Sequence, residues 1–152
     1  MVNSLLWVEK PFTISFKEDY PAPYLIDFPS LGLDGTGFLS VAENADNIPF
    51  DIQRVFWTYD VPEKAIRGEH AHHRLEQILI AVKGTILVIT EQGDGLTHKF
   101  VLDSPTVGLY IPPHVWHYME YSGSAIQVVL ASMPYSEEEY IRSYEKFKEI
   151  YK

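Results

Sequence analysis

The stretch Arg67-Gly-Glu-His-Ala-His-His-Arg-Leu-Glu-Gln77 is the most informative part of the sequence, because it places His70 and His72 one residue apart. In an extended backbone, successive side chains point to opposite faces, so these two histidines project from the same face of a strand. Arg74 would share that face if the strand continued. Two neighbouring imidazoles directed into a barrel suit proton transfer near neutral pH, or metal ligation through neutral nitrogens.

A second histidine segment lies downstream of this stretch. Glu76 completes the spacing His-x-His-x3-Glu, and His117 ends the segment Ile111-Pro-Pro-His-Val-Trp-His117. Together they form the two-part pattern of cupins, in which three histidines and one glutamate from adjoining strands converge inside one barrel. A His-x-His pair alone is a weak signal, whereas the two parts combined with a β-rich chain are a strong one. Solvent exposure is expected for His73 and His98, and a structural role for His114.

The chain around these segments has the pattern of an all-β sandwich or barrel. Short β-branched and aromatic runs alternate with Gly, Pro, Asn and Asp, and Lys83-Gly84 is a hairpin signal. We therefore predict an all-β cupin (jelly-roll) barrel over residues 31–135. Its strands are expected at Gly37 to Glu43, Arg54 to Val61, Gln77 to Val82, Thr85 to Glu91, Phe100 to Leu102, Val107 to Ile111 and Ala125 to Ser132.

The two ends of the chain read differently from the middle. Ser136-Glu-Glu-Glu139 has the spacing of a capping box, and the aromatic residues after it recur at helical spacing. This pattern predicts a C-terminal α-helix over residues 136–152, packed against the barrel. Residues 1–30 are rich in Pro and Tyr and form an extension: an added strand, an arm across a dimer partner, or a join left from a larger polypeptide.

Composition limits the function classes. The chain has 152 residues, the usual size of one domain, with 46% hydrophobic residues and no cysteine. No apolar run reaches the roughly 20 residues of a membrane helix, and the first residues lack the features of a signal peptide, so the cytoplasm is the expected compartment. The formal charge of −9 argues against nucleic acid and anionic membranes as partners. A phosphorylated small ligand would need a local cluster of arginines.

Several segments, in order, resemble the sugar 3,4-ketoisomerases that act on dTDP-4-oxo-6-deoxyglucose, also called WxcM-like cupins. The most distinctive is Arg67-Gly-Glu-His-Ala-His72 with Leu75-Glu-Gln77, because most metal cupins open this motif with glycine rather than arginine. The resemblance spans roughly residues 35–148. Its other segments are Gly37-Phe-Leu-Ser-Val-Ala-Glu43, Ile48-Pro-Phe-Asp-Ile-Gln-Arg54-Val-Phe, Leu102-Asp-Ser-Pro-Thr-Val-Gly-Leu-Tyr110, Val115-Trp-His117, Val129-Leu-Ala-Ser132 and Tyr140-Ile-Arg-Ser-Tyr144.

The resemblance implies a homodimer that binds a dTDP-linked keto sugar, with His70 and His72 as catalytic acid and base and with no metal or other cofactor. Moving a ketone from C4 to C3 requires loss of the C3 proton, an enediolate, and protonation at C4. A neutral histidine can remove a proton alpha to a carbonyl, a contribution of roughly two to four powers of ten. The developing oxyanion needs a cation or hydrogen-bond donor beside it, for which Arg67, the second histidine or a tyrosine is a candidate.

Five further residues are expected to bind the substrate. Arg54 and Arg67 are candidate clamps for the diphosphate, because guanidinium groups hold phosphate oxygens bidentately. Tyr110 and His117, placed on one strand, should face the sugar. Gln77, together with Glu76, is expected to orient the histidines. The sequence also departs from the family: Thr36 stands where an arginine is common, and Phe56 where a tyrosine is common.

The sequence is compatible with three alternatives. A metal-dependent cupin would use His70, His72, Glu76 and His117 as ligands. A 3,5-epimerase of the same substrate class also uses a histidine base in a cupin. A non-catalytic sugar-binding cupin belongs to a different class, although simple binding rarely needs paired titratable groups.

Overall fold

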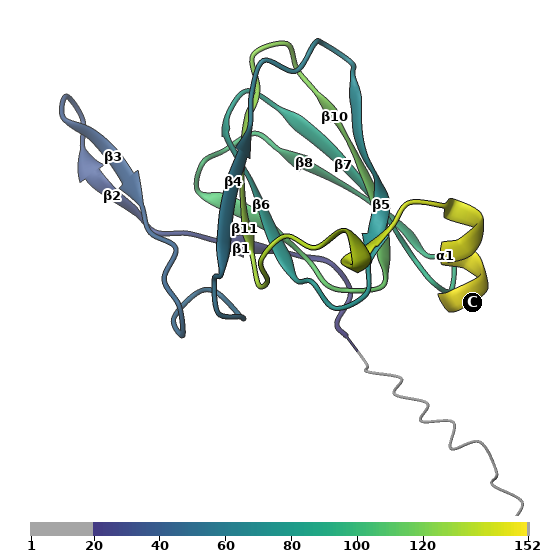
Figure 1. Cartoon of the computed structure of the whole chain (residues 1–152). Helices are drawn as coiled ribbons and strands as arrows, with labels where there is room; N and C mark the ends of the chain where they lie inside the picture. Colours follow the sequence, from purple (N-terminus) through teal and green to yellow (C-terminus); the bar gives the residue numbers. More distant parts are fainter. Residues whose placement is uncertain (1–19, 152) are drawn as a thin grey trace, which may run out of the picture.

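The structure is a computed structural model that describes residues 20–151. Most of these residues form two five-stranded antiparallel sheets that face each other as a barrel (Figure 1). The first sheet has the order β1 (Tyr24–Asp27), β9 (Val107–Ile111), β6 (Gln77–Lys83), β11 (Ile126–Ala131), β4 (Arg54–Thr58). The second has the order β12 (Tyr140–Ile141), β5 (Ile66–His72), β10 (Val115–Tyr121), β7 (Ile86–Gln92), β8 (Thr97–Leu102).

Three shorter elements complete the described chain. A hairpin of β2 (Ser30–Leu33) and β3 (Gly37–Ser40) projects from the barrel, as Figure 1 shows. The 3-10 helix η1 (Glu137–Glu139) precedes β12, and helix α1 (Tyr144–Tyr151) lies beside β5 at the end of the chain. The prediction of an all-β jelly-roll barrel with a C-terminal α-helix is confirmed. None of the helices found between residues 20 and 151 is long and apolar enough to cross a membrane.

The main core lies between the two sheets. Alternate residues of each strand point inward, and both sheets contribute buried apolar side chains, as alternation along half-buried strands requires. The members of this core include Leu79, Val88, Leu102, Leu109, Ile111 and Val129. A second cluster covers the outer face of the first sheet, where Phe28, Ile48 and Phe50 pack on Ile78, Ile80 and Leu130.

All seven predicted strands are present within a few residues of their expected bounds. The hairpin expected at Lys83-Gly84 is not formed, because β6 pairs with β9 and β11 and β7 pairs with β8 and β10. The chain does turn there: Gly84 has φ +72, a Cβ on it would lie 2.7 Å from the Ala125 Cα, and the turn joins the two sheets. The sequence interpretation assigned no strand bounds to β5 or β10, although it treated the first histidine segment as extended. It did not separate β1, β2 and β12 from the surrounding loops.

The expected helix over residues 136–152 begins later than predicted. Ser136 makes no side-chain capping bond, and Tyr140–Ile141 pairs with His72 and Ala71 of β5 instead of entering a helix. The capping box fails because the Glu139 carboxylate accepts hydrogen bonds from the backbone and side chain of Arg74, 65 residues away. The aromatic residues at helical spacing therefore divide between a strand and the shorter helix α1.

The N-terminal extension is described only from residue 20 onward. There β1 adds an edge strand to the first sheet by pairing with β9, from Tyr24 opposite Tyr110 to Asp27 opposite Val107. Of the three alternatives for the extension, an added strand is the one that Tyr24–Asp27 forms. Residues 1–19 lie outside the described residues.

Candidate active site

Three histidines from two neighbouring strands meet inside the barrel. His70 and His72 come from β5 and His117 from β10, where His117 is directly opposite His70. The ring centroids of His70 lie 4.8 Å from those of both His72 and His117, and the latter two are 5.7 Å apart. One nitrogen from each ring lies within 4.8 Å of the others. The same-face prediction for His70 and His72 is confirmed, and His117 joins them.

The backbone before the histidines brings β5 close to β10. Gly68 and Glu69 both have positive φ, at +93 and +55, so the strand bends just before His70. A Cβ on Gly68 would lie 2.9 Å from the backbone oxygen of His117, which no side chain tolerates without movement. Only glycine therefore lets the two strands approach at this point and sets the spacing of the imidazoles.

Hydrogen bonds distinguish the three imidazoles. Because a carbonyl only accepts, His70 Nδ1 donates to the Gly68 oxygen at 3.0 Å and leaves Nε2 as a lone-pair nitrogen. His117 Nδ1 donates in the same way to the Val115 oxygen at 3.2 Å, and its Nε2 accepts from the Gln77 amide at 2.9 Å. His72 has no hydrogen-bond partner among the described residues. Both nitrogens of His117 are thus occupied, whereas His70 and His72 have nitrogens available.

Burial keeps all three imidazoles neutral. Loss of solvent lowers the pKa of His70 to about 4 and that of His117 to about 3, and it lowers the pKa of His72 further. The neighbouring imidazoles lower the pKa of His72 as well, although less than burial does. Near neutral pH the cluster is therefore a set of uncharged bases, ready to accept a proton or to bind a metal ion.

A cavity of about 210 Å³ extends from the histidines along the barrel interior. His70 and His117 lie on its wall, and His72 sits beside them with 3% of its surface exposed. Leu79, Met119 and Val129 give the wall an apolar part, and Thr58, Tyr121 and Gln127 form a second polar part beyond the histidines. The lining residues are Phe56, Thr58, Arg67, Gly68, His70, Gln77, Leu79, His117, Met119, Tyr121, Gln127, Val129 and Tyr140.

Tyr140 forms one side of the cavity next to the histidines. Its position opposite His72 in the β12–β5 pair puts its ring centroid 4.6 Å from that of His72 and 5.0 Å from that of His70. The Arg142 guanidinium lies over this ring, 4.5 Å from its centroid. Sequence reasoning missed Tyr140 as a site residue because its spacing fitted a helix.

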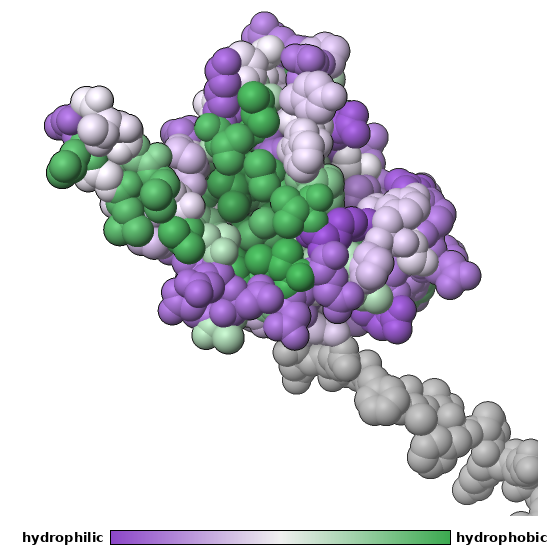
Figure 2. All heavy atoms as spheres, turned by 60° about the vertical axis from the view of Figure 1, so that its left-hand side comes forward, coloured by the Kyte–Doolittle hydropathy of each residue, from purple (hydrophilic) through white to green (hydrophobic). Residues whose placement is uncertain are grey.

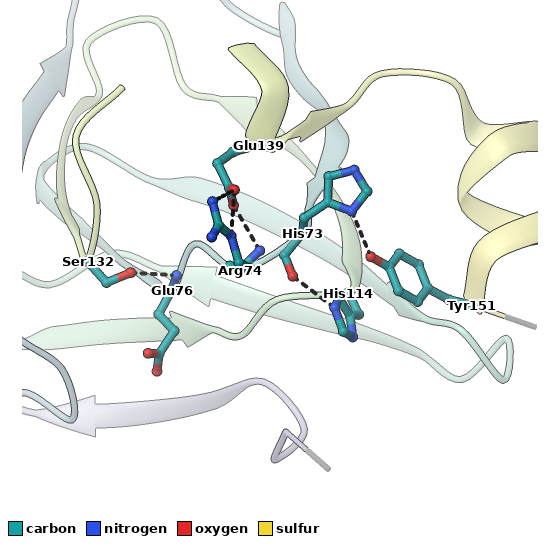
Figure 3. Close-up of polar contacts among 7 residues, drawn as sticks. All are labelled: His73, Arg74, Glu76, His114, Ser132, Glu139 and Tyr151. Atoms are coloured by element: carbon teal, nitrogen blue, oxygen red, sulfur yellow. Dashed lines mark hydrogen bonds and ion pairs between the residues drawn. The ribbon is translucent and has the colours of Figure 1, made fainter. Parts of the chain in front are cut away.

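A network of long-range contacts holds this region in place (Figure 3). The Glu139 carboxylate accepts from the Arg74 backbone N–H at 2.9 Å and from its guanidinium at 2.8 and 2.6 Å. His114 Nε2 donates to the His73 oxygen at 2.8 Å, and the Tyr151 hydroxyl of α1 lies 3.2 Å from His73 Nδ1. Arg74 does not share the face of the histidines because β5 ends at His72. His73 is half-buried, and its contact with Tyr151 differs from the expected exposed position.

The structure separates the expected arginine pair. Arg67 lines the cavity, opposite Met119 in the β5–β10 pair. Arg54 instead lies near the histidines, with its guanidinium 5.1 Å from the Phe56 ring centroid and 5.6 Å from that of Tyr135. Its Nε atom is buried without a hydrogen-bond partner in the described part of the chain. Each arginine is therefore available to a ligand, but at different places.

Tyr110 and Glu76 do not reach the cavity. Tyr110 belongs to β9 rather than to the strand of His117, and its side chain points to the outer face of the first sheet, where it packs with Phe28 and Ile78. Its hydroxyl donates to the Glu76 carboxylate at 2.6 Å. The expectations that Tyr110 faces the cavity and that Glu76 orients the histidines are wrong, because the two residues bind each other outside the barrel. Gln77 alone makes the expected contact with a histidine.

The two departures from the family pattern lie in different places. Thr36 sits in the turn of the β2–β3 hairpin, where its hydroxyl donates to the Leu33 oxygen at 3.1 Å. Phe56 lines the cavity and contributes an apolar wall at the position where a tyrosine is common.

Comparison with known proteins gives a consistent result. Residues 22–152 match the family model described as FdtA: WxcM-like, C-terminal. The chain is 44% identical over 117 residues to TDP-4-oxo-6-deoxy-alpha-D-glucose-3,4-oxoisomerase of Aneurinibacillus thermoaerophilus, covering 76% of this chain and 84% of that protein.

Solved structures agree with this match. A mutant of the 3,4-ketoisomerase QdtA from Thermoanaerobacterium thermosaccharolyticum, crystallised in complex with TDP-4-keto-6-deoxyglucose, superimposes with a TM-score of 0.81. The identity is 35%, and the match covers 85% of this chain and 93% of that one. WlaRA, a TDP-fucose-3,4-ketoisomerase from Campylobacter jejuni, superimposes with a TM-score of 0.79 at 33% identity, covering 86% and 96% of the two chains.

Proposed function

The chain belongs to the FdtA family of WxcM-like sugar 3,4-ketoisomerases, and on that premise we propose that it moves the keto group of a TDP-linked 4-oxo-6-deoxyhexose from C4 to C3. The observation that supports this reaction best is the pair of neutral imidazoles, His70 and His72, at one end of an enclosed cavity. Both have nitrogens that bind no other group in residues 20–151. Such groups suit removal and return of a proton next to a carbonyl.

The reaction needs two proton transfers at carbon and no redox cofactor. A histidine takes the proton from C3, and the C–H electron pair forms a C3=C4 double bond while the C4 carbonyl oxygen becomes an enediolate oxygen. The proton of the C3 hydroxyl passes to the C4 oxygen, and a proton returns to C4, which leaves a carbonyl at C3 and a hydroxyl at C4. Oxidation at C3 and reduction at C4 cancel, so atoms and electrons balance within the sugar.

We assign these transfers to His70 and His72. His70 presents its free Nε2 on the cavity wall, and the ring of His72 is 4.8 Å away between centroids. One imidazole takes the proton from C3 and the other delivers a proton to C4, which are the two transfers at carbon that the reaction needs. A developing oxyanion beside them raises the pKa of an imidazolium, because a nearby negative charge favours the protonated form. Burial therefore supplies the neutral base at rest, and the enediolate stabilises the charged form in the reaction.

His117 has a different role in this proposal. Its two nitrogens are occupied by the Val115 oxygen and the Gln77 amide, so it is held in one tautomer and one orientation. Its ring stands against His70 and limits the positions that His70 can adopt. We therefore treat His117 as a substrate-facing wall residue and Gln77 as the residue that positions it.

The substrate's diphosphate needs a cation, and the net charge of −9 makes arginines near the cavity informative. Arg67 lies on the cavity wall, and Arg54 has a buried Nε without a partner in the described chain. Guanidinium groups keep their charge at any working pH and hold phosphate oxygens bidentately. Both arginines are accordingly proposed to bind the substrate.

A metal-dependent reaction is the second candidate, because three imidazole nitrogens lie within 4.8 Å of one another. The four-ligand set that the sequence allowed is not assembled, since the Glu76 carboxylate binds Tyr110 outside the barrel. A metal ion would also have to displace the Gln77 amide from His117 Nε2. We therefore favour acid/base catalysis by the histidines themselves.

We also propose that the protein works as a homodimer. The outer face of the first sheet exposes Val55, Trp57 and Val82, and the β2–β3 hairpin beside it exposes Leu33 and Phe38. Figure 2 shows apolar surface on the hairpin and on the adjoining face of the barrel. A two-stranded hairpin is marginally stable alone, and an apolar surface of this kind marks an interface. A second copy of the chain is the occupant we propose.

A direct assay tests the proposed function. Purified protein is mixed with TDP-4-oxo-6-deoxyglucose, and the sugar is followed by proton NMR. The expected product is the TDP-linked 3-oxo sugar. Substrate that stays unchanged, or that changes configuration at C3 or C5 while its ketone remains at C4, would reject the proposal.

A further inference from the structure

Gln127 is a buried amide that neither the fold nor the proposed reaction uses. It faces inward from β11, is 1% exposed and lines the histidine cavity. Its Oε1 accepts a hydrogen bond from the Tyr121 hydroxyl at 2.8 Å. Its Nε2 is buried and has no hydrogen-bond partner in the part of the chain that the structure describes. Two N–H donors are thus left without an acceptor.

Neighbouring side chains fix which way this amide points. Thr58 is directly opposite Gln127 in the β11–β4 pair, and the Tyr121 hydroxyl lies 2.8 Å from Gln127 Oε1. Burial raises the pKa of Tyr121 to about 12, so its phenol keeps its proton and donates it to Gln127 Oε1. With Oε1 held in this way, the NH₂ group is the free end of the amide.

The amide lies at the end of the cavity away from the histidines. Tyr121 follows His117 by four residues on β10, and a strand rises about 3.3 Å per residue, so roughly 13 Å of strand separates them. Arg67 lines the same cavity, and its charge acts on the pKa of Tyr121. Gln127 and Arg67 therefore offer hydrogen-bond donors at the end opposite to the imidazoles.

We propose that the Gln127 amide, held by Tyr121, binds an acceptor oxygen of the sugar nucleotide, either on the phosphoryl groups or on the sugar. This inference rests on the proposed function and names a binding residue for it. A buried donor without a partner lowers the stability of the free protein. Such a cost is characteristic of groups kept for a ligand, which supplies the missing acceptor when it binds.

The test removes both halves of the internal pair. The variant Tyr121→Phe with Gln127→Met keeps similar side-chain volumes and removes the hydroxyl and the amide of this hydrogen-bonded pair together. Its Tm is expected to equal or exceed that of the wild type, while KM rises at least tenfold with little change in kcat. Gln53→Met, an exposed glutamine replaced in the same way, is the matched control and keeps wild-type KM.

Calorimetric titrations with TDP alone and with a TDP-linked 6-deoxyhexose identify the oxygen. Weaker binding of both ligands assigns a phosphoryl oxygen, and weaker binding of the sugar nucleotide alone assigns a sugar oxygen. Unchanged affinity for both ligands overturns the proposal, whatever happens to Tm, because a purely structural amide changes only stability. A wild type without activity would refute the proposed function instead. The affinities could still be measured and compared, because calorimetric titration does not depend on turnover.

A measurement on the wild type covers the case in which the variant does not fold. The side-chain amide signals of Gln127, assigned through their proximity to the Tyr121 ring, are expected to shift in nitrogen-proton NMR spectra when the sugar nucleotide is added. Signals that stay in place at saturation would also overturn the proposal.

Discussion

Replacing Gly68 by alanine tests whether the approach of β5 to β10 sets the geometry of the histidines. The new Cβ would lie 2.9 Å from the His117 oxygen and 3.1 Å from the Tyr118 Cα, so the strands must move apart. Gly95 is a matched control, because it has nearly the same φ, +87 against +93, but no atom within 4 Å of its Cβ position. The two variants share the backbone strain and differ only in the contact.

The magnitudes follow from these two terms. A side chain at such a φ costs about 1–2 kcal/mol, so Gly95→Ala should lower the free energy of unfolding by that amount. Forcing strands apart adds a strain of about 1–3 kcal/mol, as overpacked cores do, so Gly68→Ala should cost about 2–5 kcal/mol. Because the displaced strand carries His70, Gly68→Ala should also lower kcat/KM at least tenfold, while Gly95→Ala keeps wild-type kinetics.

Urea unfolding and steady-state kinetics on both variants measure these effects. The reasoning fails if the two variants lose equal stability and keep equal kcat/KM, since the contact with β10 would then have no consequence. It also fails if Gly95→Ala is the less active of the two.

Four further outcomes are expected. Lowering the pH from 7 to 5 should reduce the free energy of unfolding. In the unfolded chain His70 and His117 gain a proton near pH 6.5, whereas in the folded chain their pKa values are about 4 and about 3, so acid favours the unfolded chain. Between those pKa values, each histidine changes the free energy of unfolding by at most about 1.4 kcal/mol per pH unit. In urea unfolding, the free energy of unfolding of His70→Asn should therefore depend less steeply on pH than that of the wild type. An equal dependence would contradict the argument that burial lowers the pKa of His70. Tyr140→Ala should lower kcat about tenfold by opening the cavity wall to water, whereas Tyr140→Phe keeps the ring and most of the activity; stopped assays that rank the two variants equally would remove Tyr140 from the site. Trp57→Asp should give a monomer by light scattering, and Leu96→Asp, an exposed leucine in the β7–β8 turn, should not; a Trp57→Asp protein with the mass of the wild type would exclude the proposed interface. Protein dialysed against a chelator should keep full turnover, and loss of activity that a stoichiometric metal restores would favour the metal-dependent alternative.

The sequence predicted the features that depend on local periodicity. His70 and His72 share a face because side chains alternate at that end of β5, and the chain turns at Gly84 because glycine suits its positive φ, although the turn joins two sheets and forms no hairpin. The spacing of turn residues was likewise sufficient to locate the main strands of the barrel.

Features that depend on distant partners could not be predicted in this way. Alternation along β9 shows which side chains share a face but not whether that face is the inner or the outer face of the sheet. The sequence therefore predicts Tyr110 in the cavity, whereas in the structure it lies on the outer face. The capping box predicted at Ser136 is not formed because the Glu139 carboxylate accepts a hydrogen bond from Arg74 instead. Tyr140 is consequently a strand residue, paired with His72. Gln127 carried no sequence signal at all, since only the folded barrel shows that its amide lacks a partner.

Deuterium exchange with two histidine variants tests the central claim most directly. His70→Asn and His72→Asn are each mixed with TDP-4-oxo-6-deoxyglucose in deuterated water, with His98→Asn as the control outside the cavity lining, and the sugar is followed by NMR. The account predicts that both variants still bind TDP but neither form the 3-oxo sugar nor introduce deuterium into the ring, whereas His98→Asn turns over as the wild type does. Full turnover by the protein with both His70 and His72 replaced would contradict it.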